Sequence, residues 1–167
     1  MVIRPERLVD ISAIRTVNRE AFETPTEADL VDGLREQAQP IVSLVAEDAG
    51  TIVGHIMFSP AILHTHPEIR IMGLAPMAVV PARQREGIGS ALVREGLAQC
   101  RQLDVKVVIV LGHADYYPRF SFTRASRFAV TCEYEVPDDV FMLVELEEGV
   151  LRGKSGTVRY HEAFSKV

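Results

Sequence analysis

The sequence feature that most constrains the fold is an amphipathic helix placed between two apolar extended segments. Residues 69–80 form a long extended run, and residues 105–111 are apolar and β-branched, which is typical of a buried central strand. Between them, residues 87–101 carry a continuous apolar stripe at helical spacing, made of Gly89, Leu92, Val93, Gly96, Leu97 and Cys100. We therefore predict a strand–helix–strand unit with parallel strands and a right-handed crossover.

The segments around this unit predict further helices and strands. Gly73 and Pro76 interrupt the run 69–80, so we expect a bulge or a splay there. The tail from Glu147 is polar and is assigned no structure, although residues 158–164 could dock on the domain. The other expected elements are a strand at 1–4, helices at 11–22 and from 26 to before Pro40, a hairpin of strands 41–47 and 52–58, a short helix at 114–120, and antiparallel strands at 128–135 and 141–146.

Composition excludes several classes of protein. With 47% hydrophobic and 25% charged residues, the chain of 167 residues has enough apolar surface for a core, so disorder over its whole length is excluded. No apolar run approaches about 18 residues, and charges interrupt the N-terminal segment, so we expect neither a membrane span nor a signal peptide. A net charge of −5 argues against general nucleic-acid binding. The two cysteines, Cys100 and Cys132, exclude a disulfide framework and favour the cytoplasm, and no metal-ligand spacing is present.

The loop between strand 69–80 and the following helix carries the chemistry. It is basic, and the helix begins with Gly87 and Gly89. A helix N-terminus has unpaired backbone N–H groups and a partial positive charge, and glycine lets a phosphate come close to the backbone. The pattern is neither a P-loop nor a Rossmann fingerprint. It predicts either a pyrophosphate cradle or a tight turn in which Gly89 only allows close packing.

Two motifs resemble those of the GNAT N-acetyltransferase superfamily. Gln84-x-x-Gly87-x-Gly89 is similar to its acyl-CoA signature Arg/Gln-x-x-Gly-x-Gly/Ala, and Tyr117-Pro-Arg-Phe-Ser-Phe resembles its Tyr-x-x-x-Gly-Phe segment. The chain looks most like a bacterial subgroup of predicted N-acetyltransferases. The resemblance implies one GNAT domain over 1–167, with a core at about 1–146 and a tail at 147–167. The implied fold is α+β: a mixed, mostly antiparallel sheet of about six to seven strands, flanked by helices and splayed between strands 69–80 and 105–111.

The resemblance also implies the ligands and their sites. Acetyl-CoA would be the co-substrate, a primary amine the acceptor, and a homodimer the common assembly. Backbone groups of Met77 and Val79 would bind the acetyl carbonyl and pantetheine, with an N–H near Met77 or Ala78 holding the oxyanion. The side chains of Arg83 and Arg85 either reach a phosphate or stay solvated. Backbone N–H groups around the pyrophosphate would come from Arg85, Glu86, Gly87, Ile88, Gly89 and Ser90.

Tyr117 matches the position of the family's general acid. A phenol near the sulfur can protonate the departing CoA thiolate, because the pKa values of thiols and phenols, about 8.5 and about 10, are close. Tyr117 could instead only pack against the cofactor, and its neighbour Tyr116 is a second candidate. Two departures from the family pattern stand out: Ser121 replaces the glycine of the second motif, and Gly112-His113 stands where an asparagine is common.

No general base is evident in the sequence. Three candidates, Glu20, Glu23 and Glu27, lie in the helix pair that borders the acceptor cleft in the family, although they could equally form a solvated face. His55 could be a base or a cleft residue, or a satisfied half-buried histidine, and His113 directly follows a buried strand.

The sequence thus predicts direct attack of an amine on acetyl-CoA. The acceptor could be a small metabolite, a polyamine or a peptide N-terminus, and the acidic balance mildly favours a cationic one. The alternatives are a non-catalytic acyl-CoA-binding module and an enzyme that uses a longer acyl-CoA.

Overall fold

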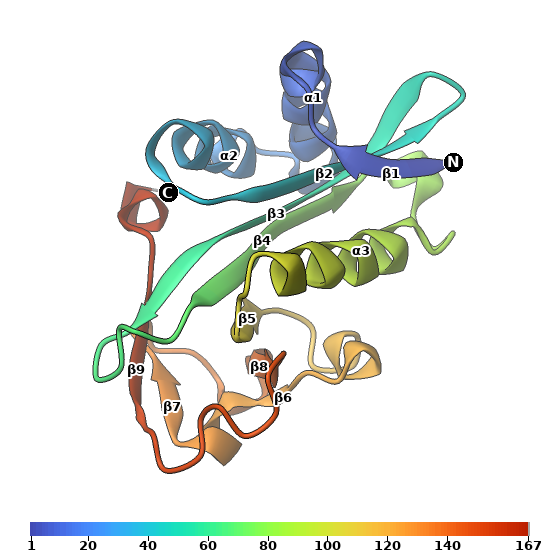
Figure 1. Cartoon of the computed structure of the whole chain (residues 1–167). Helices are drawn as coiled ribbons and strands as arrows, with labels where there is room; N and C mark the ends of the chain where they lie inside the picture. Colours follow the sequence, from blue (N-terminus) through green and yellow to red (C-terminus); the bar gives the residue numbers. More distant parts are fainter. Residues whose placement is uncertain (167) are drawn as a thin grey trace.

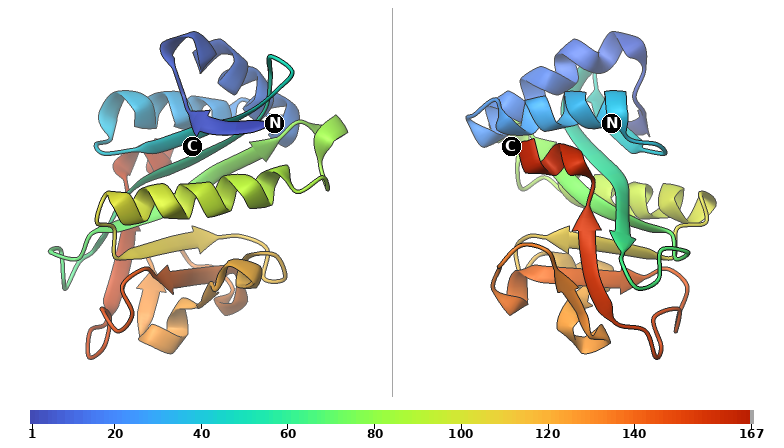
Figure 2. Two further views of the ribbon diagram at one scale, coloured as in Figure 1. Left: turned by 45° about the vertical axis from the view of Figure 1, so that its right-hand side comes forward. Right: turned by 90° about the vertical axis from the view of Figure 1, so that its left-hand side faces the viewer.

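The computed structural model describes residues 1–166 and shows one nine-stranded mixed sheet with helices on both faces (Figures 1 and 2). Its main path runs β1-β2-β3-β4-β5-β8-β6, and β9 pairs with β3 and β7. The helices are α1 (Ile11–Phe22), α2 (Thr26–Gln37) and α3 (Ile88–Gln102). The strands are β1 (Val2–Pro5), β2 (Val42–Asp48), β3 (Thr51–Leu63), β4 (Ile71–Val79), β5 (Val107–Leu111), β6 (Thr123–Arg124), β7 (Val130–Cys132), β8 (Phe141–Glu145) and β9 (Gly156–Tyr160).

Alternation along β3 divides the core between the two faces of the sheet. Ile56 and Phe58 belong to the cluster under α3, whereas Met57 belongs to the cluster under α1 and α2. Helix α3 lies close to the sheet because Gly96 faces Phe58, and a Cβ at Gly96 would overlap the phenyl ring. Cys100 is buried on the same helix, as the stripe predicted, and burial raises the pKa of its thiol to about 12. We therefore assign Cys100 to packing.

The central strand–helix–strand unit is present, and its strands diverge. β4 pairs with β3 from Ile71 to Val79, with a register shift between Ile56 and Phe58 of β3. Its parallel pairing with β5 ends at Leu74, opposite Val110. The irregularity expected in this run is therefore confirmed near Pro76, whereas Gly73 pairs regularly with Ser59 and Ile109. One edge of residues 75–79 is left without a strand partner among the described residues.

Four expectations about the C-terminal half need correction. The sheet has nine strands, more than the six to seven expected. In place of the strand expected at 128–135 there is only the short strand β7, which pairs parallel with β9. The helix expected at 114–120 is a 3-10 turn, Tyr117–Phe120. The tail, to which the sequence assigns no structure, supplies β9 and a 3-10 helix, Glu162–Lys166. The docking considered for residues 158–164 is confirmed, because Ala163 packs in the cluster under α1 and α2.

These differences share a cause. Short strands depend on partners that lie far away in the sequence, and a single 3-10 turn is too short to show a helical period, so local patterns predict both poorly. Among residues 1–166, none of the helices combines the length and the apolar character needed to cross a membrane.

Candidate active site

The loop between β4 and α3 presents a row of free backbone N–H groups. Arg85 and Gly87 adopt left-handed conformations, with φ of 66° and 85°, and α3 begins directly after Gly87. The backbone N–H groups of residues 85–90 donate to no acceptor among the described residues. Consecutive N–H groups that alternate with left-handed residues form an anion-binding concavity, to which the helix dipole adds positive potential.

The first residue of the glycine motif holds this loop closed. The side-chain Nε2 of Gln84 donates to the carbonyl oxygen of Val79 at 3.0 Å. This bond ties the loop to the last residue of β4, so the free N–H groups stay next to the open edge of that strand. A glutamine or arginine in this position can serve the same purpose, because both carry side-chain N–H donors.

The two arginines of the loop have different surroundings. Arg83 donates to Asp48 of the β2–β3 hairpin and to Glu86, both at 3.0 Å, and it is only partly exposed. Arg85 is exposed and forms no ion pair with a described residue. The structure therefore assigns Arg83 to holding the loop, and it leaves Arg85 available to an anion.

Residues of the two sequence motifs meet beside the open edge of β4. A Cβ on Gly89 would lie 3.3 Å from both the Met77 Cε atom and the Tyr116 hydroxyl. The Tyr116 hydroxyl is also 3.0 Å from the Ser90 Oγ atom. Ala78, next to Met77, is buried and lies opposite His55 in the β3–β4 ladder. The start of α3, the open edge of β4 and the second motif thus border the same space.

Tyr116 is held firmly at the start of α3. The Arg119 guanidinium lies over its ring, 4.4 Å from the ring centroid, and the Arg119 Nε donates to the Tyr116 carbonyl at 2.9 Å. The ring also meets Phe120 edge-on. Because its hydroxyl is hydrogen-bonded to Ser90, Tyr116 lies close to the free N–H groups of the loop.

Tyr117 lies deeper, between the end of β5 and the core. Its side chain is 6% exposed and packs edge-on against Phe122. The hydroxyl makes no hydrogen bond to a described residue, yet it is not among the fully enclosed polar atoms, so it retains contact with solvent. Burial raises the pKa of Tyr117 to about 12, so the phenol stays protonated at neutral pH.

Ser121 adopts a left-handed backbone conformation, which favours glycine, the residue that the family motif has at this position. Its φ is 73°, and its N–H donates to the Pro118 carbonyl at 3.0 Å, closing the 3-10 turn of the second motif. Replacement of the motif glycine by Ser121 therefore leaves the left-handed backbone conformation in place.

His55 is entirely buried, more deeply than the half-buried position the sequence suggested. The Asn18 Nδ2 donates to the Ile14 carbonyl at 3.0 Å and lies 3.2 Å from the His55 Nδ1, so this ring nitrogen accepts. The His55 Nε2 then carries the proton and donates to the Ser43 Oγ at 2.9 Å. Burial lowers the pKa of His55 to about 4, and the imidazole is therefore neutral.

This network continues to the surface through residues that the sequence analysis missed. The Ser43 hydroxyl donates to the Glu6 carboxylate. The Arg35 guanidinium donates two hydrogen bonds to the same carboxylate, at 2.7 and 3.1 Å. Its members come from the residue after β1 and from β2, β3, α1 and α2, and no local pattern joins them. A buried, neutral and fully bonded histidine suits a structural role.

The remaining candidates lie apart from one another. Glu20 is exposed and lines a groove beside α1. Glu23 is exposed at the C-terminus of α1, and Glu27 accepts a hydrogen bond from the Thr24 hydroxyl at 3.1 Å. His113 is exposed, and its carbonyl accepts from the Tyr116 and Tyr117 N–H groups at 3.1 and 3.4 Å. The structure does not gather these side chains into one cluster.

Comparison with known proteins identifies the class. The sequence model of the family described as an acetyltransferase (GNAT) domain matches residues 2–125. The chain belongs to the GNAT family of N-acetyltransferases. It is 33% identical, over 167 residues and 99% of both chains, to an Escherichia coli K12 protein named uncharacterized N-acetyltransferase YhbS.

Two solved structures share the fold over nearly the whole chain. The E. coli YhbS structure, in complex with CoA, has a TM-score of 0.92 at 32% identity and covers 98% of this chain and 91% of that one. A GNAT family acetyltransferase from Brucella melitensis, in complex with acetyl-CoA, has a TM-score of 0.81 at 37% identity, with 98% and 97% covered. The expected family and fold are thus confirmed.

Proposed function

We propose that this chain binds acetyl-CoA and transfers its acetyl group to a primary amine. The observation that carries the proposal is the row of free N–H groups at residues 85–90 beside the open edge of β4. A pyrophosphate needs such donors, and a pantetheine arm can pair with a free strand edge. The CoA and acetyl-CoA complexes of the two related proteins support this reading.

In this proposal each part of acetyl-CoA has its own contacts. The pyrophosphate accepts hydrogen bonds from the backbone of Arg85, Glu86, Gly87, Ile88, Gly89 and Ser90. Arg85 adds a free positive charge, because its side chain has no partner in the described structure. The pantetheine and the acetyl carbonyl lie along Met77, Ala78 and Val79 at the edge that β5 leaves open.

The chemistry then needs an oxyanion donor and an acid. The neutral amine attacks the thioester carbonyl, and a backbone N–H near Met77 or Ala78 stabilises the oxyanion. As the C–S bond breaks, the sulfur takes the electron pair and accepts a proton from Tyr117, while the amine nitrogen loses its proton to solvent. Tyr117 is available for this role, because its hydroxyl is free and protonated at neutral pH. Its raised pKa widens the gap to the thiol, so the phenolate that forms takes a proton back from solvent at once.

Tyr116 suits a different role. Its hydroxyl is paired with Ser90 at the start of α3, next to the proposed pyrophosphate site. We therefore assign Tyr116 to shaping the cofactor site, and Tyr117 to the proton transfer.

Thermal unfolding with acetyl-CoA tests binding. At about 100 times its Kd, the ligand should add roughly 2.7 kcal/mol to the free energy of unfolding, which raises the Tm by several degrees. CoA should act similarly, and ATP serves as the control for a general phosphate effect. If neither acetyl-CoA nor CoA raises the Tm, the glycine loop is only a turn that allows close packing.

Thiol release with a panel of amines tests turnover. Tyr117→Phe should lower kcat by about 10²- to 10⁴-fold and leave acetyl-CoA binding nearly unchanged. Tyr116→Phe should weaken binding more than it lowers kcat. Binding without thiol release from any amine would favour the non-catalytic acyl-CoA module, and the same assay with longer acyl-CoA donors would reveal a different acyl preference.

A further inference from the structure

The β2–β3 hairpin carries two adjacent carboxylates that hold different parts of the molecule. Its turn is formed by Ala49 and Gly50, both with positive φ, so the connection is tight. Glu47 and Asp48 come directly before this turn, at the end of β2. Because neighbouring residues of a strand point to opposite faces of the sheet, the two carboxylates reach different partners.

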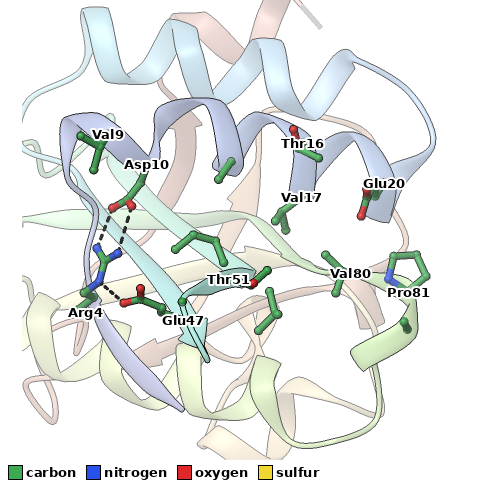
Figure 3. A pocket seen from close by; sticks show the side chains of 15 residues that line it. Arg4, Val9, Asp10, Thr16, Val17, Glu20, Glu47, Thr51, Val80 and Pro81 are labelled. Atoms are coloured by element: carbon green, nitrogen blue, oxygen red, sulfur yellow. Dashed lines mark hydrogen bonds and ion pairs between the residues drawn. The ribbon is translucent and has the colours of Figure 1, made fainter.

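Glu47 faces the groove beside α1. The walls of this groove come from the N-terminal segment, α1, the hairpin and the residues that follow β4 (Figure 3). The Arg4 guanidinium donates to Glu47 at 3.0 Å and to both carboxylate oxygens of Asp10, at 2.7 and 3.1 Å (Figure 3). Asp10 directly precedes α1. Glu47 therefore helps to fasten the start of α1 to the sheet.

Asp48 reaches residues 81–89, the loop that leads into α3. The Arg83 Nη2 donates to the Asp48 Oδ2 at 3.0 Å, and the Arg83 Nε donates to the Glu86 Oε1 at 3.0 Å. The α-amino group of Met1 lies 3.6 Å from the other Asp48 oxygen. The hydrogen bond from Arg83 lowers the pKa of the Asp48 carboxyl, so this carboxylate is charged at neutral pH.

The contact between Arg83 and Asp48 holds this loop from outside. The Gln84 side chain donates to Val79, only five residues earlier, and the backbone bonds of the loop are local too. Within the described part of the chain, the bond to Asp48 is the only hydrogen bond that joins residues 81–89 to a segment distant in the sequence. The position of the loop therefore depends on the hairpin.

We propose that Asp48 is a positioning residue for acetyl-CoA, because through Arg83 it fixes the loop whose backbone N–H groups receive the pyrophosphate. A loop that is already held in place loses less conformational freedom when a ligand binds, so the contact strengthens binding. Asp48 lies outside both sequence motifs. The inference rests on the proposed function, since it takes the pyrophosphate to bind at residues 85–90.

Limited trypsin digestion tests the position of the loop without any cofactor. Trypsin cleaves after arginine, and Arg83 and Arg85 both lie in the loop. Asp48→Ala should raise the rate of cleavage after these two residues about two- to fivefold, as expected for the loss of a partly exposed ion pair. Fragment masses identify the bonds that are cut.

Glu47→Ala is the matched control. It removes the same charge from the neighbouring residue, whose partner Arg4 keeps Asp10. Cleavage after Arg83 and Arg85 should stay as slow as in the unmodified protein. Equal cleavage rates for the two alanine variants would refute the inference.

Binding and kinetics test the consequence for acetyl-CoA. By titration calorimetry, the Kd of acetyl-CoA should be about two- to fivefold higher for Asp48→Ala than for Glu47→Ala, which has the same net charge. The KM for acetyl-CoA should rise by the same factor at unchanged kcat. Asp48→Glu keeps the carboxylate and should bind nearly like the unmodified protein. At about 1 M NaCl the two alanine variants should bind almost equally, because salt screens exposed ion pairs.

The two proposals fail in different ways. Equal Kd values for Asp48→Ala and Glu47→Ala at low salt, or a lower kcat at unchanged KM for Asp48→Ala, would overturn the positioning role. An unmodified protein that does not bind acetyl-CoA would refute the proposed function. The trypsin digestion would then still decide whether Asp48 holds the loop.

Discussion

The ring of Tyr117 lies in the space that a side chain on Gly112 would need. A Cβ at Gly112 would overlap the Cε2 atom of the tyrosine. Gly112, directly after β5, therefore determines the position of the Tyr117 ring. We predict that Gly112→Ala displaces the ring and lowers kcat at least tenfold, while acetyl-CoA binding changes little, because misplacing a catalytic group by about 1 Å is costly. Steady-state kinetics and a binding titration measure the two effects.

Gly33→Ala is the matched control for this substitution. A Cβ there meets nothing closer than 4.0 Å, and the residue lies within α2. Its kcat should equal that of the unmodified protein. Equal kcat values for the two alanine variants would show that the position of Tyr117 does not matter for turnover.

The raised pKa of Tyr117 predicts the shape of the alkaline pH profile. Since burial holds this pKa at about 12, the phenol remains an acid throughout the stable pH range. The value of kcat/KM should rise as the amine acceptor deprotonates and show no descending limb below about pH 10. A descending limb in this range that Tyr117→Phe removes would show that the phenol ionises far more easily than its burial implies.

Ser121 offers a stability test that is independent of catalysis. A serine at φ of 73° bears a steric cost that glycine avoids. Ser121→Gly should raise the free energy of unfolding by about 0.5–1 kcal/mol, measured by urea denaturation. Ser126→Gly, at an exposed position without positive φ in the next 3-10 turn, should lower it by a similar amount. Destabilisation by both substitutions would argue that the Ser121 hydroxyl has a role of its own.

His55 should make the stability of the fold depend on pH. Its folded pKa of about 4 lies below the ordinary value of 6.5, because the buried imidazole is held neutral. The unfolded chain therefore takes up the proton first as the pH falls. Stability that is fully present above about pH 7 is lost toward pH 4, and we expect a loss of about 2 kcal/mol between pH 7 and pH 5.

Denaturation at several pH values, compared between two variants, checks this assignment. His55→Gln should be less stable at pH 7 and should lose most of the slope between pH 7 and pH 5. His113→Gln replaces an exposed histidine and should keep the slope. A steep slope that persists without His55 would assign the effect to other groups.

The sequence predicted well the elements that local spacing encodes. The stripe from Gly89 to Cys100 fixes which side of α3 faces the sheet, since a helix of 3.6 residues per turn brings those positions together. The free N–H groups at residues 85–90 also follow from local order, because a strand, a turn with glycines and a helix start must expose them. Family motifs then indicated the ligand for that geometry.

The surroundings of the other candidates could not be predicted in this way. His55 could have been a cleft residue, and its burial depends on Asn18, Ser43 and Glu6, which reach it from separate elements. Tyr116 and Tyr117 are neighbours in sequence, yet one hydroxyl is bonded at the start of α3 and the other is free beside the core. The groove beside α1 combines four separate segments of the chain.

By itself, the sequence determined the strand–helix–strand unit, the glycine loop with its free backbone N–H groups, and membership of the acetyltransferase family. These follow from patterns within single elements and the short segments that join them, where periodicity and backbone preferences dominate. Only the tertiary structure decided the depth of His55, the different surroundings of the two tyrosines, the strand formed by the tail, and the groove at Glu20. Those properties depend on long-range packing, which sets burial and therefore the pKa, hydrogen bonding and accessibility of each side chain.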